Sequence, residues 1–183
     1  MPRPNNRKGG PGRGREKSEF DQYILDLARV TRVTEGGKQM SFRVCVIIGD
    51  RKGKVGYGVA KGADVQLGVD KAVRQARKNL ITVPFIRETI PHFVVSKFKA
   101  ATVMLKPAPR GSGIIAGGAV RSVLELAGVP NISSKILGKT KNKIVVVKAT
   151  FEALKSFKRS AVEKANQPKR SAVPMAALAE LKK

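Results

Sequence analysis

Residues 64–81 carry an apolar stripe at helical spacing, and this stripe constrains the fold more than any other feature of the chain. Its members are Val65, Val69, Ala72, Val73, Ala76 and Leu80. The opposite face carries the basic residues Lys71, Arg74, Arg77 and Lys78. An amphipathic helix of this kind must bury its stripe against another element. The pattern therefore predicts a helix that packs on a partner surface and turns a basic face outward.

Strand-like segments that could form this partner surface precede the helix. Residues 23–33 mix helical and alternating spacing, and we interpret them as mostly strand. Residues 35–38 (EGGK) have the composition of a hairpin turn, with two glycines that tolerate positive φ. Residues 41–48 are rich in β-branched side chains, as strands are. Strand, hairpin, strand, strand and helix predict a compact α+β unit.

The third strand, at residues 55–60, alternates Gly56 and Gly58 along one face. That face is nearly bare, so a neighbouring backbone or a phosphate can approach it closely.

A second unit follows a connection at residues 84–91. Its expected strands, glycine-rich loop and helix lie at residues 92–98, 101–106, 107–118 and 120–127. Gly128 fits a helix C-cap. Residues 143–154 are ambiguous. Their run of β-branched residues at 144–147 favours a strand, whereas the spacing of Val147, Phe151 and Leu154 favours a helix, so both interpretations stay open here.

The charge balance predicts a polyanionic partner. Lys and Arg number 37 against 13 Asp and Glu, a formal net charge of +24, and phosphates are the partner that neutralises such an excess. Apolar runs such as residues 44–48 are far shorter than a membrane span, so we expect no membrane association. The basic start of the chain and the single Cys45 lead us to expect a cytoplasmic protein without a secretory signal.

We expect four segments along the chain. They are a disordered basic arm at residues 1–19, two folded domains at residues 20–86 and 87–158, and a basic tail at residues 159–183, with helical potential in residues 172–181. The arm is equally compatible with nucleic-acid contact and with a merely solvated tail.

Nucleotide chemistry finds little support. Residues 111–116 (GSGIIA) match G-x-G-x-x-A, but Glu125 comes too early to bind a ribose, and no other acid follows before Glu152. Neither this run nor the second glycine cluster, at residues 56–62, contains the G-K-[ST] of a phosphate-binding P-loop. Cys45 and the only histidine, His92, are too few for a structural zinc site. We therefore expect no catalysis, cofactor, metal or small-molecule substrate, and we interpret Cys45 as a core residue.

Several distinctive runs would be unusual together by chance: residues 29–31 with 36–38, 49–58, 76–79, and above all 111–121 (GSGIIAGGAVR). In these runs the chain closely resembles the bacterial type of the small-subunit ribosomal protein S-five family over residues 27–154. The resemblance implies an α+β fold: an N-terminal β-β-β-α domain similar to double-stranded-RNA-binding domains, and a C-terminal β-α-β-α domain. It also favours a helix at residues 143–154.

The resemblance implies a structural constituent of the small ribosomal subunit that supports assembly and decoding accuracy. The implied partners are small-subunit (16S-type) rRNA, ribosomal proteins S-four and S-eight, and messenger RNA on the path by which it enters the subunit. The loop at Gly36-Gly37 is associated with spectinomycin sensitivity in that family, and residues 111–121 lie near S-four. An enzyme that uses the glycine loops and a DNA-compacting protein are the competing functions.

Charge and resemblance together select the candidate site residues. For RNA binding they are Arg32, Gly36, Gly37, Lys38, Arg43, Arg51, Lys52, Lys54, Tyr57, Lys61, Lys71, Arg74 and Lys78; for a protein interface they are Arg110, Gly111, Gly113 and Arg121. The chain has no Trp and only two Tyr, so folded or duplex RNA fits better than single strands that stack on aromatic rings.

The sequence departs from the family pattern in three places. Glu35 replaces an expected basic residue, Arg110 an expected acid, and Lys143 with Val145 an expected Pro and Asn. Arg110 bears most on function, because it changes the charge pairing implied at the S-four interface.

Overall fold

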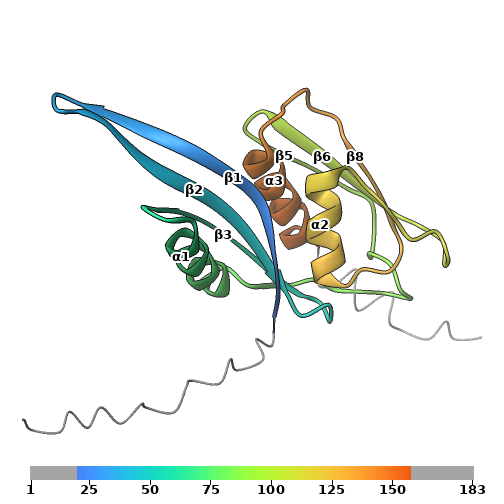
Figure 1. Cartoon of the computed structure of the whole chain (residues 1–183). Coiled ribbons are helices and arrows are strands. Elements are labelled where there is room, and N and C mark those ends of the chain that lie inside the picture. Colours follow the sequence, from blue (N-terminus) through green and yellow to red (C-terminus); the bar gives the residue numbers. More distant parts are fainter. Residues whose placement is uncertain (1–19, 158–183) are drawn as a thin grey trace, which may run out of the picture.

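The computed structural model describes residues 20–157, so the predicted arm at residues 1–19 and the predicted tail at 159–183 lie outside the described residues. Two four-stranded sheets and three helices form the described part of the chain (Figure 1). The elements are β1 (Asp21–Thr34), β2 (Gly37–Gly49), β3 (Lys54–Gly62), α1 (Val65–Lys78), β4 (Ile81–Thr82), β5 (Val94–Phe98), β6 (Ala101–Pro107), β7 (Ile114–Ile115), α2 (Gly118–Ala127), β8 (Ile132–Ile136) and α3 (Lys143–Lys155). The predicted α+β class is confirmed.

The first sheet is antiparallel in the order β1-β2-β3-β4. Its β1–β2 hairpin is paired from Asp21↔Gly49 to Thr34↔Gly37, with a register shift between Ile24 and Asp26. The distal part of this hairpin extends well beyond the other strands (Figure 1). The sequence-based interpretation of residues 23–33 as mostly strand is therefore confirmed.

Helix α1 lies against β2 and β3 at the glycine-bearing face. The side chain of Asp64 caps its first turn, and Ala72 and Ala76 of the predicted stripe are fully buried. A Cβ at Gly58 would clash with the backbone carbonyl oxygen of Ala72, and one at Gly56 with that of Ala76. The two glycines thus admit the helix backbone, one of the two approaches that the sequence suggested.

The end of this helix corrects the sequence prediction. Helix α1 stops at Lys78, with Asn79 as its C-cap, and does not continue to residue 81. Ile81 instead pairs with Val55 in the short strand β4. Pairing with the edge of β3 and partial burial of the β-branched Ile81 outweigh the helical spacing there.

The second sheet has the order β5-β6-β8-β7, with β7 parallel to β8 and the other pairs antiparallel. The strands predicted at residues 92–98 and 101–106 are present as β5 and β6. The segment predicted as a loop, residues 107–118, contains β7. The β-α-β-α order that the resemblance implied includes a strand between the two helices, and β8 is that strand. Gly128 has a left-handed φ of 78° at the end of α2, as expected of a C-cap.

Helix α3 resolves the open reading of residues 143–154 in favour of a helix, as the family resemblance implied. Asn142 caps it through hydrogen bonds from the backbone N–H groups of Ile144 and Val145. Seven of its residues are buried: Val146, Val147, Ala149, Thr150, Phe151, Ala153 and Leu154. Burial on this scale outweighs the strand preference of its β-branched run.

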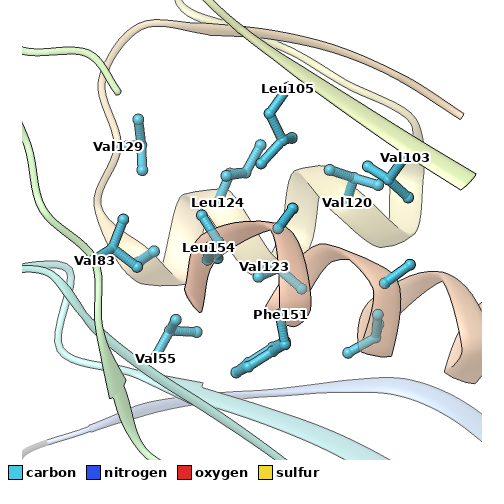
Figure 2. Packing of buried hydrophobic residues seen from close by; sticks show 14 of the residues in the cluster. Val55, Val83, Val103, Leu105, Val120, Val123, Leu124, Val129, Phe151 and Leu154 are labelled. Carbon is cyan, nitrogen blue, oxygen red and sulfur yellow. The ribbon is translucent and has the colours of Figure 1, made fainter. Parts of the chain in front are cut away.

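Helices α2 and α3 lie between the two sheets, and one apolar core joins these three layers (Figure 2). Val55 of β3 and Leu105 of β6 belong to the same cluster as Leu124 of α2 and Phe151 of α3. A separate small cluster lies under α1. The division into domains at residues 20–86 and 87–158 remains a prediction, because the main core crosses that boundary.

The close approach of α1 to β3 generates a stability prediction. Gly58→Ala should lower the free energy of unfolding by about 1 to 3 kcal/mol, because the added methyl group pushes against the helix backbone. The matched control is Gly118→Ala, since a Cβ at Gly118 meets nothing within 4 Å. Thermal unfolding of the two purified variants measures the difference; equal melting temperatures would contradict the packing.

Candidate nucleic-acid interface

The tip of the β1–β2 hairpin presents the first group of candidate residues. Arg32 and Lys38 are exposed there on opposite faces of the hairpin, because Arg32 pairs with Gln39 and Lys38 with Val33. Gly37 has a φ of 130°, whereas Gly36 does not adopt a positive φ, so only one of the two expected positions needs a glycine for its conformation. The tip can therefore present cations to both sides.

The turn between β2 and β3 carries the second group, Arg51, Lys52 and Lys54, all exposed. Burial acts to raise the pKa of Asp50, but hydrogen bonds from the backbone N–H groups of Lys54 (2.9 Å) and Lys52 (2.7 Å) outweigh it and lower that pKa. The ionised Asp50 thus holds the turn in shape. Arg51 also forms an ion pair with Asp21 at 2.7 Å.

This turn is fastened to the end of α2. The Arg51 backbone N–H donates to the carbonyl of Leu126 at 3.0 Å, and that of Gly53 donates to the carbonyl of Ala127 at 2.9 Å. These bonds satisfy two carbonyls at the end of the helix. The basic turn is consequently attached to the folded core through α2 and does not form an unsupported loop.

The third group lies on the outer face of α1. Lys71, Arg74 and Lys78 are all exposed, and none of them forms an ion pair with another described residue. Their spacing of three and four residues places them along one side of the helix. They form a row of cations without an ion-pair partner among the described residues, and the one acid within α1 is the exposed Asp70, four residues before Arg74.

Arg43 and Tyr57 lie deeper than the sequence suggested. Arg43 pairs with Asp26 at 3.3 Å, and Lys143 approaches the other oxygen of that carboxylate at 3.8 Å. The ring of Tyr57 meets that of Phe151 edge-on, with centroids 4.6 Å apart. Burial, followed by the negative charge of Glu152, raises the pKa of the Tyr57 hydroxyl. Both residues therefore take part in the packing between β1–β3 and α3.

The candidate RNA-binding residues do not form one patch. The hairpin tip and the β2–β3 turn lie at opposite ends of the 13-residue strand β2, a separation of about 40 Å at the usual rise of a strand. The α1 row lies on one face of the sheet, whereas Arg43 and the exposed Lys61 lie on the other, as their pairing across β2 and β3 requires. The hairpin tip, the β2–β3 turn and the α1 row are thus three separate basic surfaces, and Lys61 belongs to none of them.

The predicted protein-interface residues belong to the loop before α2 and to the first turn of that helix, where other parts of the protein leave space beside the backbone. A Cβ at Gly111, Gly113 or Gly118 would meet nothing within 4 Å. Helix α2 begins after Gly117 without a side-chain cap, so its first N–H groups are available to an acceptor. Arg121 is exposed and pairs with Glu125 at 2.8 Å along the same helix.

Asn131, which the sequence did not single out, holds this loop in place. It is buried, and its Oδ1 accepts a hydrogen bond from the backbone N–H of Gly113 at 3.1 Å. Its backbone N–H donates to the carbonyl of Glu88 at 3.2 Å, and its own carbonyl accepts from the hydroxyl of Thr89 at 2.8 Å. One residue thus ties the glycine loop to a second turn that lies far away in sequence.

That second turn, at residues 86–89, supplies an acidic partner for Arg110. Arg87 and Glu88 have φ values of 50° and 68° within a two-residue turn closed by the pair Ile86 and Thr89. Glu88 forms an ion pair with Arg110 at 3.5 Å. The basic residue at this departure from the family pattern therefore has an acidic partner inside the chain. Such a pairing depends on the tertiary fold, so no local signal could have revealed it.

Other kinds of site receive no support from the geometry. Cys45 is buried, as predicted; burial and then the negative charge of Asp26 raise the pKa of its thiol to about 11. Among residues 20–157, no three His, Cys, Asp or Glu side chains gather as metal ligands would. None of the described helices is both long and apolar enough to cross a bilayer.

Comparison with known families agrees with the two-sheet architecture. The family described as "Ribosomal protein S5, N-terminal domain" matches residues 20–84, which hold the first sheet and α1. The family described as "Ribosomal protein S5, C-terminal domain" matches residues 96–167, which hold most of the second sheet with α2 and α3. The two matches follow one another in that order and together span most of the chain. The chain therefore belongs to the ribosomal protein S5 family, whose members are structural components of the small ribosomal subunit.

Proposed function

We propose that this chain binds 16S-type rRNA in the cytoplasm through three basic surfaces and contacts neighbouring ribosomal proteins through residues 110–121. The observation that carries the RNA-binding part is the α1 row, Lys71, Arg74 and Lys78, which has no acidic partner among the described residues. A row of cations without ion-pair partners on a helix suits the regularly spaced phosphates of folded RNA.

The hairpin tip and the β2–β3 turn are the second and third RNA-binding surfaces of this proposal. Their separation along β2 favours contact with different rRNA segments, which would let one rigid protein hold those segments together during assembly. The hairpin tip is also the part of the fold that extends furthest from the core (Figure 1). The proposal assigns the tip to the neck of the subunit and the basic residues of the first sheet to the path of messenger RNA.

Residues 110–121 form the protein-facing part of the proposal. Open glycines, an uncapped helix start and Arg121 lie on one continuous segment. Helix starts and guanidinium groups both favour carboxylate or phosphate acceptors. Ribosomal protein S-four is the proposed neighbour here and S-eight a further one, with the internal Arg110–Glu88 pair reducing the charge that this chain offers to S-four.

The α1 row generates the first prediction. Replacing Lys71, Arg74 and Lys78 together with Gln should weaken rRNA binding and flatten its dependence on salt, because each duplex phosphate that no longer meets a cation reduces the slope by roughly 0.9. Lys155→Gln, which removes one exposed lysine from the end of α3, is the control and should keep the wild-type slope. Filter binding over a salt series provides the measurement. An unchanged slope in the triple variant, or tighter binding to duplex DNA than to rRNA, would contradict the proposal.

The hairpin tip generates the second prediction. Gly37→Val should strain the turn by about 1 to 3 kcal/mol, because Val adopts a φ near 130° only at a cost. Gly36→Val is the matched control, since Gly36 has no positive φ and a Cβ there meets nothing within 4 Å. Cells that carry Gly37→Val should differ from wild type in spectinomycin response or subunit assembly, and cells with Gly36→Val should differ less. Wild-type spectinomycin response and subunit assembly in cells that carry Gly37→Val would remove the tip from the proposal.

The glycine loop generates the third prediction. Gly113 has a φ of 68°, so Gly113→Val should distort the loop without a clash inside the protein. Arg121→Ala removes the cation at the start of α2. Both variants should stay folded and alter stop-codon readthrough in ribosomes that contain them, whereas Lys155→Ala should not. Wild-type readthrough in both would show that this segment has no part in decoding.

A further inference from the structure

The second sheet leaves one of its faces bare. Helices α2 and α3 pack on the inner face, where Val103, Leu105 and Ile132 are fully buried in the main core. The side chains that alternate with these point to the opposite side of the sheet, the outer face. No helix of the described residues covers the outer face (Figure 1).

The strand register defines the outer face. Val95, Met104 and Lys135 form one row across β5, β6 and β8. Lys97 and Thr102 form the next row, and Leu137 extends it through a hydrogen bond from its backbone N–H to the carbonyl of Thr102 at 2.9 Å. Lys106, Ser133 and Ile115 form a third row. The outer face therefore consists of Val95, Lys97, Thr102, Met104, Lys106, Ile115, Ser133, Lys135 and Leu137.

Large apolar side chains on the outer face are unusually exposed. The exposed fractions are 47% for Val95, 56% for Ile115 and 54% for Leu137, and Phe93, just before β5, adds 53%. Single exposed apolar residues are normal, but several on one flat surface are typical of a contact with another macromolecule. Strands β5, β6, β7 and β8 contain no Asp or Glu, so the lysines of this face have no acidic neighbour on their own sheet.

We propose that the outer face binds a partner protein whose surface presents aliphatic side chains flanked by carboxylates. Charge complementarity selects this occupant: three lysines surrounded by apolar groups require acids and apolar groups in return. RNA would satisfy the lysines and leave the aliphatic side chains without partners, and one phenylalanine is a poor stacking surface for bases.

The same charge argument disfavours this chain as its own partner. A second copy would bring two lysine-bearing faces together. Residues 158–183 hold seven Lys or Arg and two Glu, so they too would add positive charge to a positive surface. The acidic partner protein is thus the occupant that this chemistry fits.

Photo-crosslinking in assembled small subunits tests the proposal. A benzophenone amino acid placed at Val95, and separately at Leu137, should crosslink to one and the same other protein, within a segment that contains Asp or Glu. Leu67 on α1, which is equally exposed at 54%, is the control position and should not capture that protein. Crosslinks to rRNA, to residues 158–183 or to a second copy would overturn the proposal, as would the absence of crosslinks.

A substitution then tests the chemistry of the contact. Leu137→Asp and, separately, Lys135→Glu should reduce the crosslink from position 95 at least about 10-fold, because each places a carboxylate against an acidic, apolar surface. Leu67→Asp should leave that crosslink unchanged. All three proteins should keep the wild-type melting temperature, since the changed residues are exposed. An undiminished crosslink in both outer-face variants would overturn the proposal. The rRNA affinity of the purified Leu137→Asp protein should be unaltered, which separates this inference from the proposed RNA binding.

Discussion

The packing of α2 and α3 between the two sheets is the interaction on which the rest of the structure depends. Ile47 and Val55 reach these helices from the first sheet, and Val103 and Leu105 reach them from the second, within one apolar cluster. The β1–β2 hairpin and the segment at residues 110–121 are therefore held in a fixed relation to each other. A binding surface that is rigid before it meets its partner loses less entropy on association. The core thus links folding directly to the proposed binding of rRNA.

Acidic side chains are scarce, and the structure uses several of them to tie its parts together. Asp26 joins Arg43 of β2 to Lys143 of α3, and Asp21 pairs with Arg51 of the β2–β3 turn. Such exposed or half-exposed pairs contribute little stability individually. Their greater effect is on the distribution of positive charge. Arg43, Arg51 and Lys143 have acidic partners, whereas the candidate cations on α1 and at the hairpin tip have none among the described residues. A polyanion would therefore meet cations without an ion-pair partner on α1 and at the hairpin tip.

The sequence predicted those elements whose signal is local. The stripe of α1 and the β-branched run of β2 needed no knowledge of the rest of the fold, and Gly58 correctly indicated a close approach of backbone. The local pattern did not predict the short strands β4, β7 and β8, because two to five residues show no clear period and their pairing partners are distant in sequence. Only the family resemblance implied a strand at the position of β8. The helix α3 was ambiguous for a related reason, since burial on most sides hides helical periodicity. For the site, charge identified the exposed cations, but the packing of Tyr57 and the anchoring role of Asn131 depend on tertiary contacts.

The single cysteine lies where the two halves of the structure meet. Cys45 points from β2 toward the side of the sheet that packs on α3, with an exposed fraction of 1% and a pKa of about 11. At pH 7 roughly one in ten thousand such thiols is ionised, so alkylating reagents attack it very slowly while the protein stays closed. Once the first sheet separates from α3, the thiol regains the reactivity of an ordinary cysteine. The rate at which an alkylating reagent labels Cys45 consequently reports how often the first sheet separates from α3. Cys45 is the only cysteine of the sequence, so the label reports on this one position.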